Sequence, residues 1–119
     1  MSDHTLQMTM LYDFFGELLT EKQQEYFDLY HNEDLSLSEI ASQAGISRQG
    51  VHDIITRAEK TLLEFEEKTG VVKRWNETRA QLEKAEVMAK KLGELTKNNP
   101  GLDSLTSQLV KTLQNLSMQ

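Results

Sequence analysis

Apolar residues recur along most of this chain at the three- and four-residue spacing that places side chains on one face of a helix. One proline and six glycines in 119 residues leave few interruptions, and the abundant Leu, Glu, Gln and Lys residues favour helix. The pattern therefore predicts an all-α protein with six helices. The first is expected from about Leu6 to Leu19, and its predicted apolar stripe is Leu6, Met10, Phe14 and Leu18.

Hydroxyl side chains mark where the next three helices begin. The segments Thr20–Gln23 and Ser36–Glu39 are capping boxes, in which the first and last side chains satisfy free backbone N–H groups. Ser47 is the expected cap of a long fourth helix. The predicted ends are Asn32 for the second helix, Ala44 for the third and Thr69 for the fourth, the last two followed by Gly45 and Gly70.

The last two predicted helices form a helical hairpin. Asn99 and Pro100 interrupt the pattern, Asn99 as the cap and Pro100 in the first turn of the final helix. The fifth helix has a heptad-like stripe, which comprises Trp75, Leu82, Ala85, Ala89 and Leu92. The final helix carries Leu102, Leu105, Leu109, Leu113 and Leu116. Because these stripes are longer than a small core needs, we expect self-association as a symmetric homodimer.

The third and fourth helices together satisfy the requirements of a helix-turn-helix. Ala41 is the small residue where the two helices touch, and Gly45 supplies a turn residue that tolerates positive φ. The positions expected to point inward are Ile40, Ala44, Ile46, Val51 and Ile54. A helix-turn-helix is a packing arrangement, so its ligand can be DNA, protein or a ribonucleoprotein.

If the motif binds DNA, the N-terminal half of the fourth helix enters the major groove. Arg48 and Gln49 would reach base edges first, since arginine can read guanine and glutamine can read adenine. Arg57 and Lys60 could hold phosphates. The other outward-facing candidates are Ser47 at the cap, His52 and Thr56. Asp53 lies on the same face and would repel the DNA backbone, so we expect weak and salt-sensitive binding.

Charge is distributed unevenly between the two parts of the chain. Residues 1–70 hold 14 acidic and 5 basic residues, whereas residues 71–119 hold 5 acidic and 8 basic residues. The sequence thus predicts a helix-turn-helix domain over 1–70 and an amphipathic hairpin over 71–119, used for packing or oligomerisation. The absence of cysteine and of any apolar run near the roughly 18 residues that span a bilayer favours a cytoplasmic protein without membrane insertion.

The segment from Thr20 to Gln49 resembles sigma-factor region 4, and the chain more closely resembles the YlxM family of small bacterial proteins. The closer match includes Leu11–Phe15 and Leu18–Thr20, which the region-4 pattern lacks, and it covers roughly residues 6 to 75. Beyond Trp75 the resemblance fades. One departure is Gly50, where we expect alanine and where glycine costs about 1 kcal/mol of helix stability.

The resemblance implies a DNA-binding regulatory protein that takes part in the signal recognition particle pathway of protein targeting. It places Ser47, Arg48 and Gln49 at the start of the recognition helix and Arg57 on the exposed face of that helix. An accessory protein that binds the particle's GTPase or RNA directly is the alternative, because the basic half of the chain differs so much from the acidic half.

No catalytic or metal-binding motif is evident, and we expect neither an enzyme nor a bound cofactor. His4, His31 and His52 are far apart and lack a second ligand at metal-binding spacing, so a zinc site is not predicted. The sequence also has no glycine-rich phosphate loop and no nucleophile motif.

Overall fold

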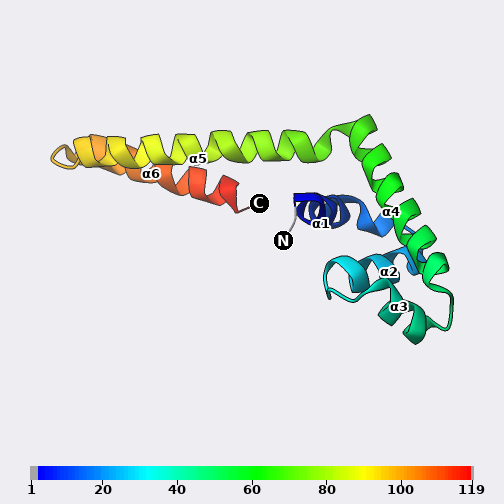
Figure 1. Cartoon of the computed structure of the whole chain (residues 1–119). Helices are drawn as coiled ribbons and strands as arrows, with labels where there is room; N and C mark the ends of the chain where they lie inside the picture. Colours follow the sequence, from blue (N-terminus) through cyan, green and yellow to red (C-terminus); the bar gives the residue numbers. More distant parts are fainter. Residues whose placement is uncertain (1–2, 119) are drawn as a thin grey trace. The chain divides into compact units, whose positions relative to one another are not determined.

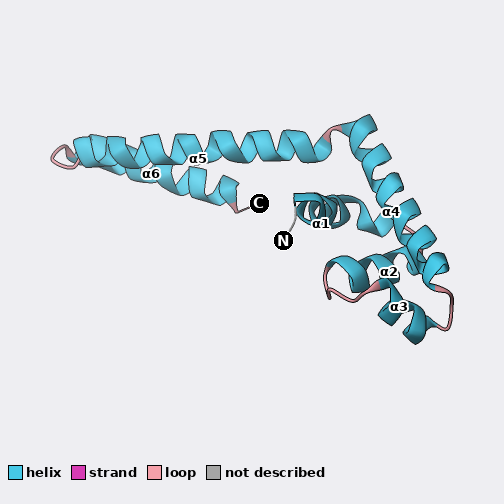
Figure 2. Ribbon diagram, in the orientation of Figure 1, coloured by secondary structure: helices cyan, strands magenta, loops and turns pink. Residues whose placement is uncertain are grey.

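The computed structural model describes residues 3–118, and within them it contains six α-helices and one 3-10 turn but no strand (Figure 1 and Figure 2). The predicted all-α class is confirmed. The elements are α1 (Asp3–Phe15), η1 (Gly16–Leu18), α2 (Glu21–His31), α3 (Leu37–Ala44), α4 (Arg48–Thr69), α5 (Val71–Leu95) and α6 (Pro100–Ser117). The chain divides into two compact units, one reaching Val72 and the other beginning at Lys73.

Side-chain oxygens that accept backbone N–H groups fix the starts of α2, α3, α4 and α6. In both capping boxes the bonds run in both directions, at 3.0 and 3.2 Å in Thr20–Gln23 and at 3.1 Å twice in Ser36–Glu39. Ser47 Oγ accepts the N–H of Gly50 at 3.0 Å, and Asn99 Oδ1 accepts that of Leu102 at 3.2 Å. At the C-terminal ends of α3 and α4, Gly45 and Gly70 take the left-handed conformation, with φ values of 72° and 62°. All six sequence signals therefore lie at helix ends.

The core of the first unit forms where α1 packs against α4 and α2. Its buried residues are Met8, Leu11, Phe15, Leu19, Phe27, Ala58, Leu62 and Val72. The ring of Tyr12 stacks on Phe27 with centroids 4.7 Å apart, which extends this core along α2. These contacts hold α4 along its length, so α4 is a fixed element of the first unit.

The predicted apolar stripe of the first helix is wrong. Leu6, Phe14 and Leu18 are 56%, 37% and 65% exposed, while Met8 and Leu11 are buried. The first segment carries apolar residues on more than one face, and two stripes satisfy the same helical spacing. Contacts with α2 and α4 select between them, and those contacts are not visible in the local sequence.

The second unit is an antiparallel hairpin, in which α6 runs back alongside α5 after a short turn (Figure 1). Thr96 and Thr106 meet across the hairpin, with their hydroxyl oxygens 3.3 Å apart. Ala89 is buried as the heptad-like pattern predicts, whereas Leu92 is 45% exposed. On α6, the residue buried against α5 is Thr106, and four of the five predicted leucines are exposed: Leu102, Leu105, Leu109 and Leu116.

Candidate nucleic-acid interface

A small apolar cluster holds the two helices of the helix-turn-helix together. It contains the buried residues Tyr26, Ile40, Ala41, Val51 and Ile55, which come from α2, α3 and α4. Because Tyr26 belongs to α2, the motif is anchored to the rest of the first unit. The start of α4 is consequently presented on a rigid support.

Of the five predicted inward positions, Ile40 and Val51 are buried, Ile54 packs against the cluster from its edge, and the other two are wrong. Ala44 and Ile46 are exposed, because α3 ends at Ala44 and the left-handed Gly45 redirects the chain before α4 begins. Ile54 is only partly buried, and Ile55 takes the core position beside Val51. The buried stripe of α4 therefore advances by four residues from Val51, rather than by three.

The exposed face of α4 carries the residues predicted to contact nucleic acid. Ser47 is the N-cap, and all six of the others are exposed: Arg48, Gln49, His52, Thr56, Arg57 and Lys60. They lie within the first four turns of the helix, outside the stripe of Val51, Ile55, Ala58 and Leu62 that packs on the core. Arg48 and Arg57 lie at opposite edges of this exposed face, with Gln49, Thr56 and Lys60 between them. The fold thus places the predicted residues together on one accessible helical surface.

Asp53 joins two of these residues. Gln49 Nε2 donates a hydrogen bond to Asp53 Oδ1 at 2.9 Å, and the same oxygen lies 3.7 Å from His52 Nδ1. The Asp53 side chain therefore orients the Gln49 amide and occupies one of its two N–H donors, while the other N–H and the amide oxygen remain available. Asp53 also places a negative charge in the middle of the exposed face.

The basic residues of this face have no acidic partner among the described residues. None of the salt bridges there involves Arg48, Arg57 or Lys60. Guanidinium and ammonium groups without a local partner are free to bind an anion such as phosphate. These three cations are concentrated on α4 in a unit whose overall balance is acidic. Local placement rather than net charge is what suits this face to a polyanion.

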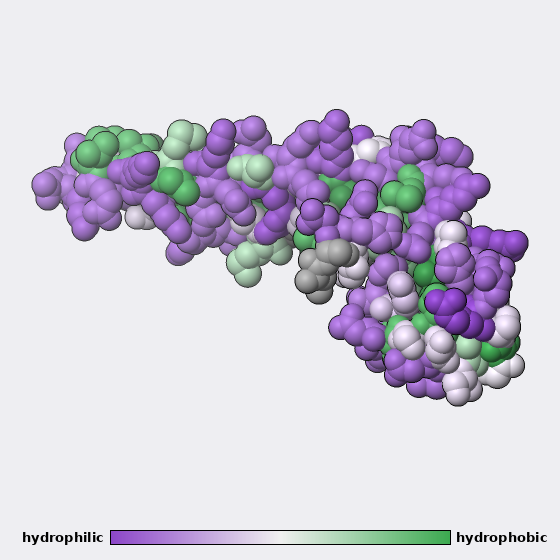
Figure 3. Space-filling model, viewed as in Figure 1, coloured by the Kyte–Doolittle hydropathy of each residue, from purple (hydrophilic) through white to green (hydrophobic). Residues whose placement is uncertain are grey.

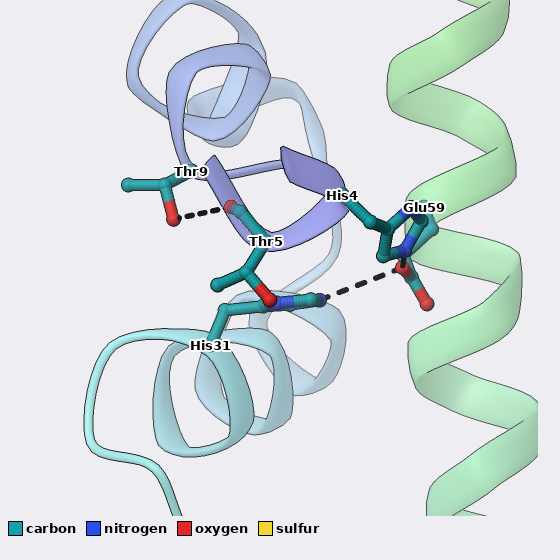
Figure 4. Close-up of polar contacts among 5 residues, drawn as sticks. All are labelled: His4, Thr5, Thr9, His31 and Glu59. Carbon is teal, nitrogen blue, oxygen red and sulfur yellow. Dashed lines mark hydrogen bonds and ion pairs between the residues drawn. The ribbon is translucent and has the colours of Figure 1, made fainter. Parts of the chain in front are cut away.

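A second polar cluster joins α4 to α1 and α2, and sequence reasoning missed it. His4 Nε2 lies 2.8 Å from Glu59 Oε2, and His31 Nε2 lies 3.5 Å from the same oxygen (Figure 4). Since an ionised carboxylate only accepts, His4 Nε2 must carry the donated proton. Figure 4 shows the two imidazoles, one from α1 and one from α2, both directed at the carboxylate of α4. Residues 4, 31 and 59 are too far apart in sequence for any spacing rule to have paired them.

The environment of Glu59 favours its ionised form. Burial by itself would raise the pKa of Glu59, but the polar contacts with His31 and His4, together with their charge, lower the pKa below its ordinary value. His31 is itself buried, and its Nε2 has no hydrogen-bond partner among the described residues. The cluster therefore ties α4 to α1 and α2 through a charge that the two histidines stabilise.

Residues 3–118 contain neither a metal-binding group of side chains nor a helix suited to a membrane. No group of three or more histidine, aspartate or glutamate side chains among them has the arrangement needed to hold a metal ion. No helix in this range is both long and apolar enough to cross a membrane.

Comparison with known proteins gives a family. The sequence profile of UPF0122, described as "Putative helix-turn-helix protein, YlxM / p13 like", matches residues 2–100. The match therefore continues beyond Trp75 and includes the whole of α5, so the expectation that the resemblance fades there is wrong.

Individual relatives support the same assignment. A UPF0122 protein of Geobacillus kaustophilus is 38% identical over 98% of this chain and 99% of its own length. One from Thermoanaerobacter sp. is 54% identical over 71% of this chain and 72% of its own. A third, from Listeria monocytogenes, is 36% identical over 98% of this chain and 99% of its own. The chain belongs to the UPF0122 family of YlxM-like helix-turn-helix proteins.

Proposed function

We propose that this protein is a DNA-binding regulatory protein whose α4 enters the major groove. The observation that carries the proposal is the exposed start of α4, where Arg48 and Gln49 project from a helix fixed by two buried clusters. Helix-turn-helix proteins read DNA through the N-terminal residues of this second helix. The role is regulatory and not enzymatic, in keeping with a family described by its helix-turn-helix.

The residues of the face divide into three groups by their proposed role. Arg48 reads guanine through paired hydrogen bonds, and Gln49 reads adenine once its amide is released from Asp53. Arg57 and Lys60 hold phosphates and set the register on the duplex. Ser47, His52 and Thr56 contribute polar contacts around them. With only three cations in place, binding is weak and depends strongly on salt.

The proposed setting is the cytoplasmic signal recognition particle pathway, which the family resemblance implies. In this proposal residues 1–70 form the module that contacts DNA and residues 71–119 join two copies. A homodimer suits DNA, because two recognition helices about 34–36 Å apart reach successive major grooves on one side of the duplex. The regulated genes are then those of the protein-targeting machinery.

A salt titration of binding to the DNA upstream of the protein's own gene tests the proposal, using the full chain and Arg48→Ala. We expect the variant to lose about 1–3 kcal/mol of binding free energy on that DNA and to discriminate less against unrelated DNA. Arg74→Ala is the control, since Arg74 is an exposed arginine outside the first unit. Equal affinity of the parent for all DNA sequences, with no effect of Arg48→Ala, would sink the proposal.

The second candidate is an accessory protein that binds the particle's GTPase or RNA directly. The observation that favours it is the charge of the second unit, which holds 8 basic and 5 acidic residues. Capture of the GTPase and RNA from lysate would fall with Lys90→Glu plus Lys91→Glu and persist with Arg48→Ala. Nuclease treatment separates the two ligands, because it abolishes capture through RNA and leaves direct capture of the GTPase intact.

A further inference from the structure

The hairpin of α5 and α6 buries little apolar surface between its own two helices. Among residues 73–118, Ala89 and Thr106 are the buried side chains. The helices approach closely at Gly93, where an added Cβ would lie 3.4 Å from Thr106 Cγ2. The small residues at this contact let the two backbones approach closely, and most of the larger leucines lie outside the contact. The contact between α5 and α6 therefore does not account for the apolar content of the hairpin.

The large apolar side chains instead gather on one side of the hairpin. Two of them directly precede the residues where α5 and α6 approach most closely. Leu92 precedes Gly93 on α5, and Leu105 precedes Thr106 on α6. In an antiparallel helix pair, positions that precede the contact on either helix fall on the same side. We define the leucine flank as Met88, Leu92 and Leu95 of α5 with Leu102, Leu105, Leu109 and Leu116 of α6.

The flank is exposed within the second unit. Its members range from 43% exposed at Leu109 to 84% exposed at Leu95. Figure 3 shows hydrophobic surface gathered at the end of the hairpin where α5 turns into α6, while most of the remaining hairpin surface in this view is hydrophilic. An apolar patch of this extent is unusual on a monomer and marks a site of association.

We propose that the leucine flank is the dimer interface and that its occupant is the same flank of a second copy, which completes a four-helix arrangement. Taking about 180 Å² for a fully exposed Leu or Met, the seven residues expose on the order of 700 Å², close to the roughly 800 Å² that each partner buries in a standard interface. The flank therefore has the extent that a stable dimer needs.

Charge makes the flank suited to itself. The seven flank residues carry no charge, and the outer positions of α6 beside them are neutral: Ser104, Gln108, Thr112 and Asn115. On α5 the exposed Lys84 and Lys91 lie at the border of the flank, outside it. Pairing of two copies by a two-fold axis brings identical residues together, so a charged flank would repel its copy. A neutral apolar flank avoids that repulsion. The proposal concerns association and is independent of whether the first unit binds DNA.

Sedimentation velocity on the full chain, without nucleic acid, tests the proposal. We expect a species of twice the 13.7 kDa chain mass at micromolar concentration, and its dissociation in the double variant Leu105→Lys with Leu109→Lys. Leu18→Lys is the matched control, because Leu18 is 65% exposed and Leu105 is 63% exposed. The control should remain dimeric. A monomeric parent, a dimeric double variant or a dissociated Leu18→Lys would each overturn the proposal.

A second measurement avoids dependence on the folding of the lysine variants. Since the chain has no cysteine, each of two variants carries a single thiol. Thr112→Cys places it between Leu109 and Leu116, on the side of the leucine flank, and Ser107→Cys places it on the opposite side of Thr106. Maleimide labelling of Thr112→Cys should slow as the protein concentration rises through the dimerisation range, while labelling of Ser107→Cys stays constant. Equal, concentration-independent labelling of both thiols contradicts the proposed interface.

Discussion

Glu59 is the residue at which three helices of the first unit meet through polar contacts. Its carboxylate lies 2.8 Å from His4 of α1 and 3.5 Å from the buried His31 of α2. The side chain of Glu59 is itself only 19% exposed, so its charge would be costly without these partners. Because Glu59 belongs to α4, this contact positions α4 relative to α1 and α2.

Glu59→Gln tests how much the charge contributes to stability. We expect the free energy of unfolding to fall by about 1–2 kcal/mol at neutral pH, because glutamine keeps the shape but loses the charge-assisted contacts. A carboxylate whose folded pKa is lowered stabilises the protein above its unfolded pKa of about 4.3. That contribution is lost as the pH falls through the folded pKa, so the difference between parent and variant should vanish in acid.

Urea denaturation between pH 7 and pH 3.5 measures this difference. Glu67→Gln is the control, because Glu67 is an exposed carboxylate on the same helix. It should unfold with the parent at every pH. A Glu59→Gln variant as stable as the parent at pH 7, or a deficit that persists in acid, would show that the cluster contributes no charge-dependent stability.

At the scale of single elements, what could be predicted from sequence was set by local chemistry. Capping boxes, the Ser47 and Asn99 caps and the two stop glycines act within three or four residues, so they located the helix ends. The prediction of the buried face of α1 was wrong, because that face is selected by packing against helices distant in sequence. The cluster of Glu59 with two histidines was missed for the same reason. The exposed positions of α4 followed from the helical period once its start was known.

The first turn of α4 combines a favourable cap with an unfavourable glycine. Ser47 Oγ accepts the N–H of Gly50 at 3.0 Å, yet a Cβ on residue 50 would lie only 3.2 Å from that oxygen. Alanine at this position would improve helix propensity by about 1 kcal/mol but would crowd the cap. Gly50 thus accommodates the cap at the expense of intrinsic helix stability.

A double-mutant cycle separates these effects. We expect Gly50→Ala to raise the free energy of unfolding by roughly 1 kcal/mol in a Ser47→Ala background, where no oxygen is crowded, and by less in the parent. Ser47→Ala alone should cost about 1 kcal/mol through loss of the cap. Denaturant midpoints of the four proteins give the coupling. Equal gains from Gly50→Ala in both backgrounds would mean that the cap and the new methyl group do not interfere.

For the molecule as a whole, the distribution of charge has more influence on the proposed DNA binding than the net charge does. The net charge is −6, but the acidic excess lies in residues 1–70, in the same unit as the exposed face of α4. The phosphate backbone supplies most of the affinity of non-specific DNA binding, and acidic groups near the contact oppose it. Asp53 is the acidic group closest to the proposed base contacts, since it bonds directly to Gln49.

Asp53→Asn should therefore strengthen DNA binding by the full chain. Asparagine retains an oxygen that can accept from Gln49 Nε2, so the local arrangement survives while the negative charge is removed. We expect a gain of several-fold at low salt on all DNA sequences, and a smaller gain as ions screen the interaction. Glu67→Gln removes the same charge from a later turn of α4 and should have a much weaker effect. If both variants bind DNA as the parent does across the salt titration, α4 does not lie against the duplex, and direct binding to the targeting particle becomes the better account of this surface.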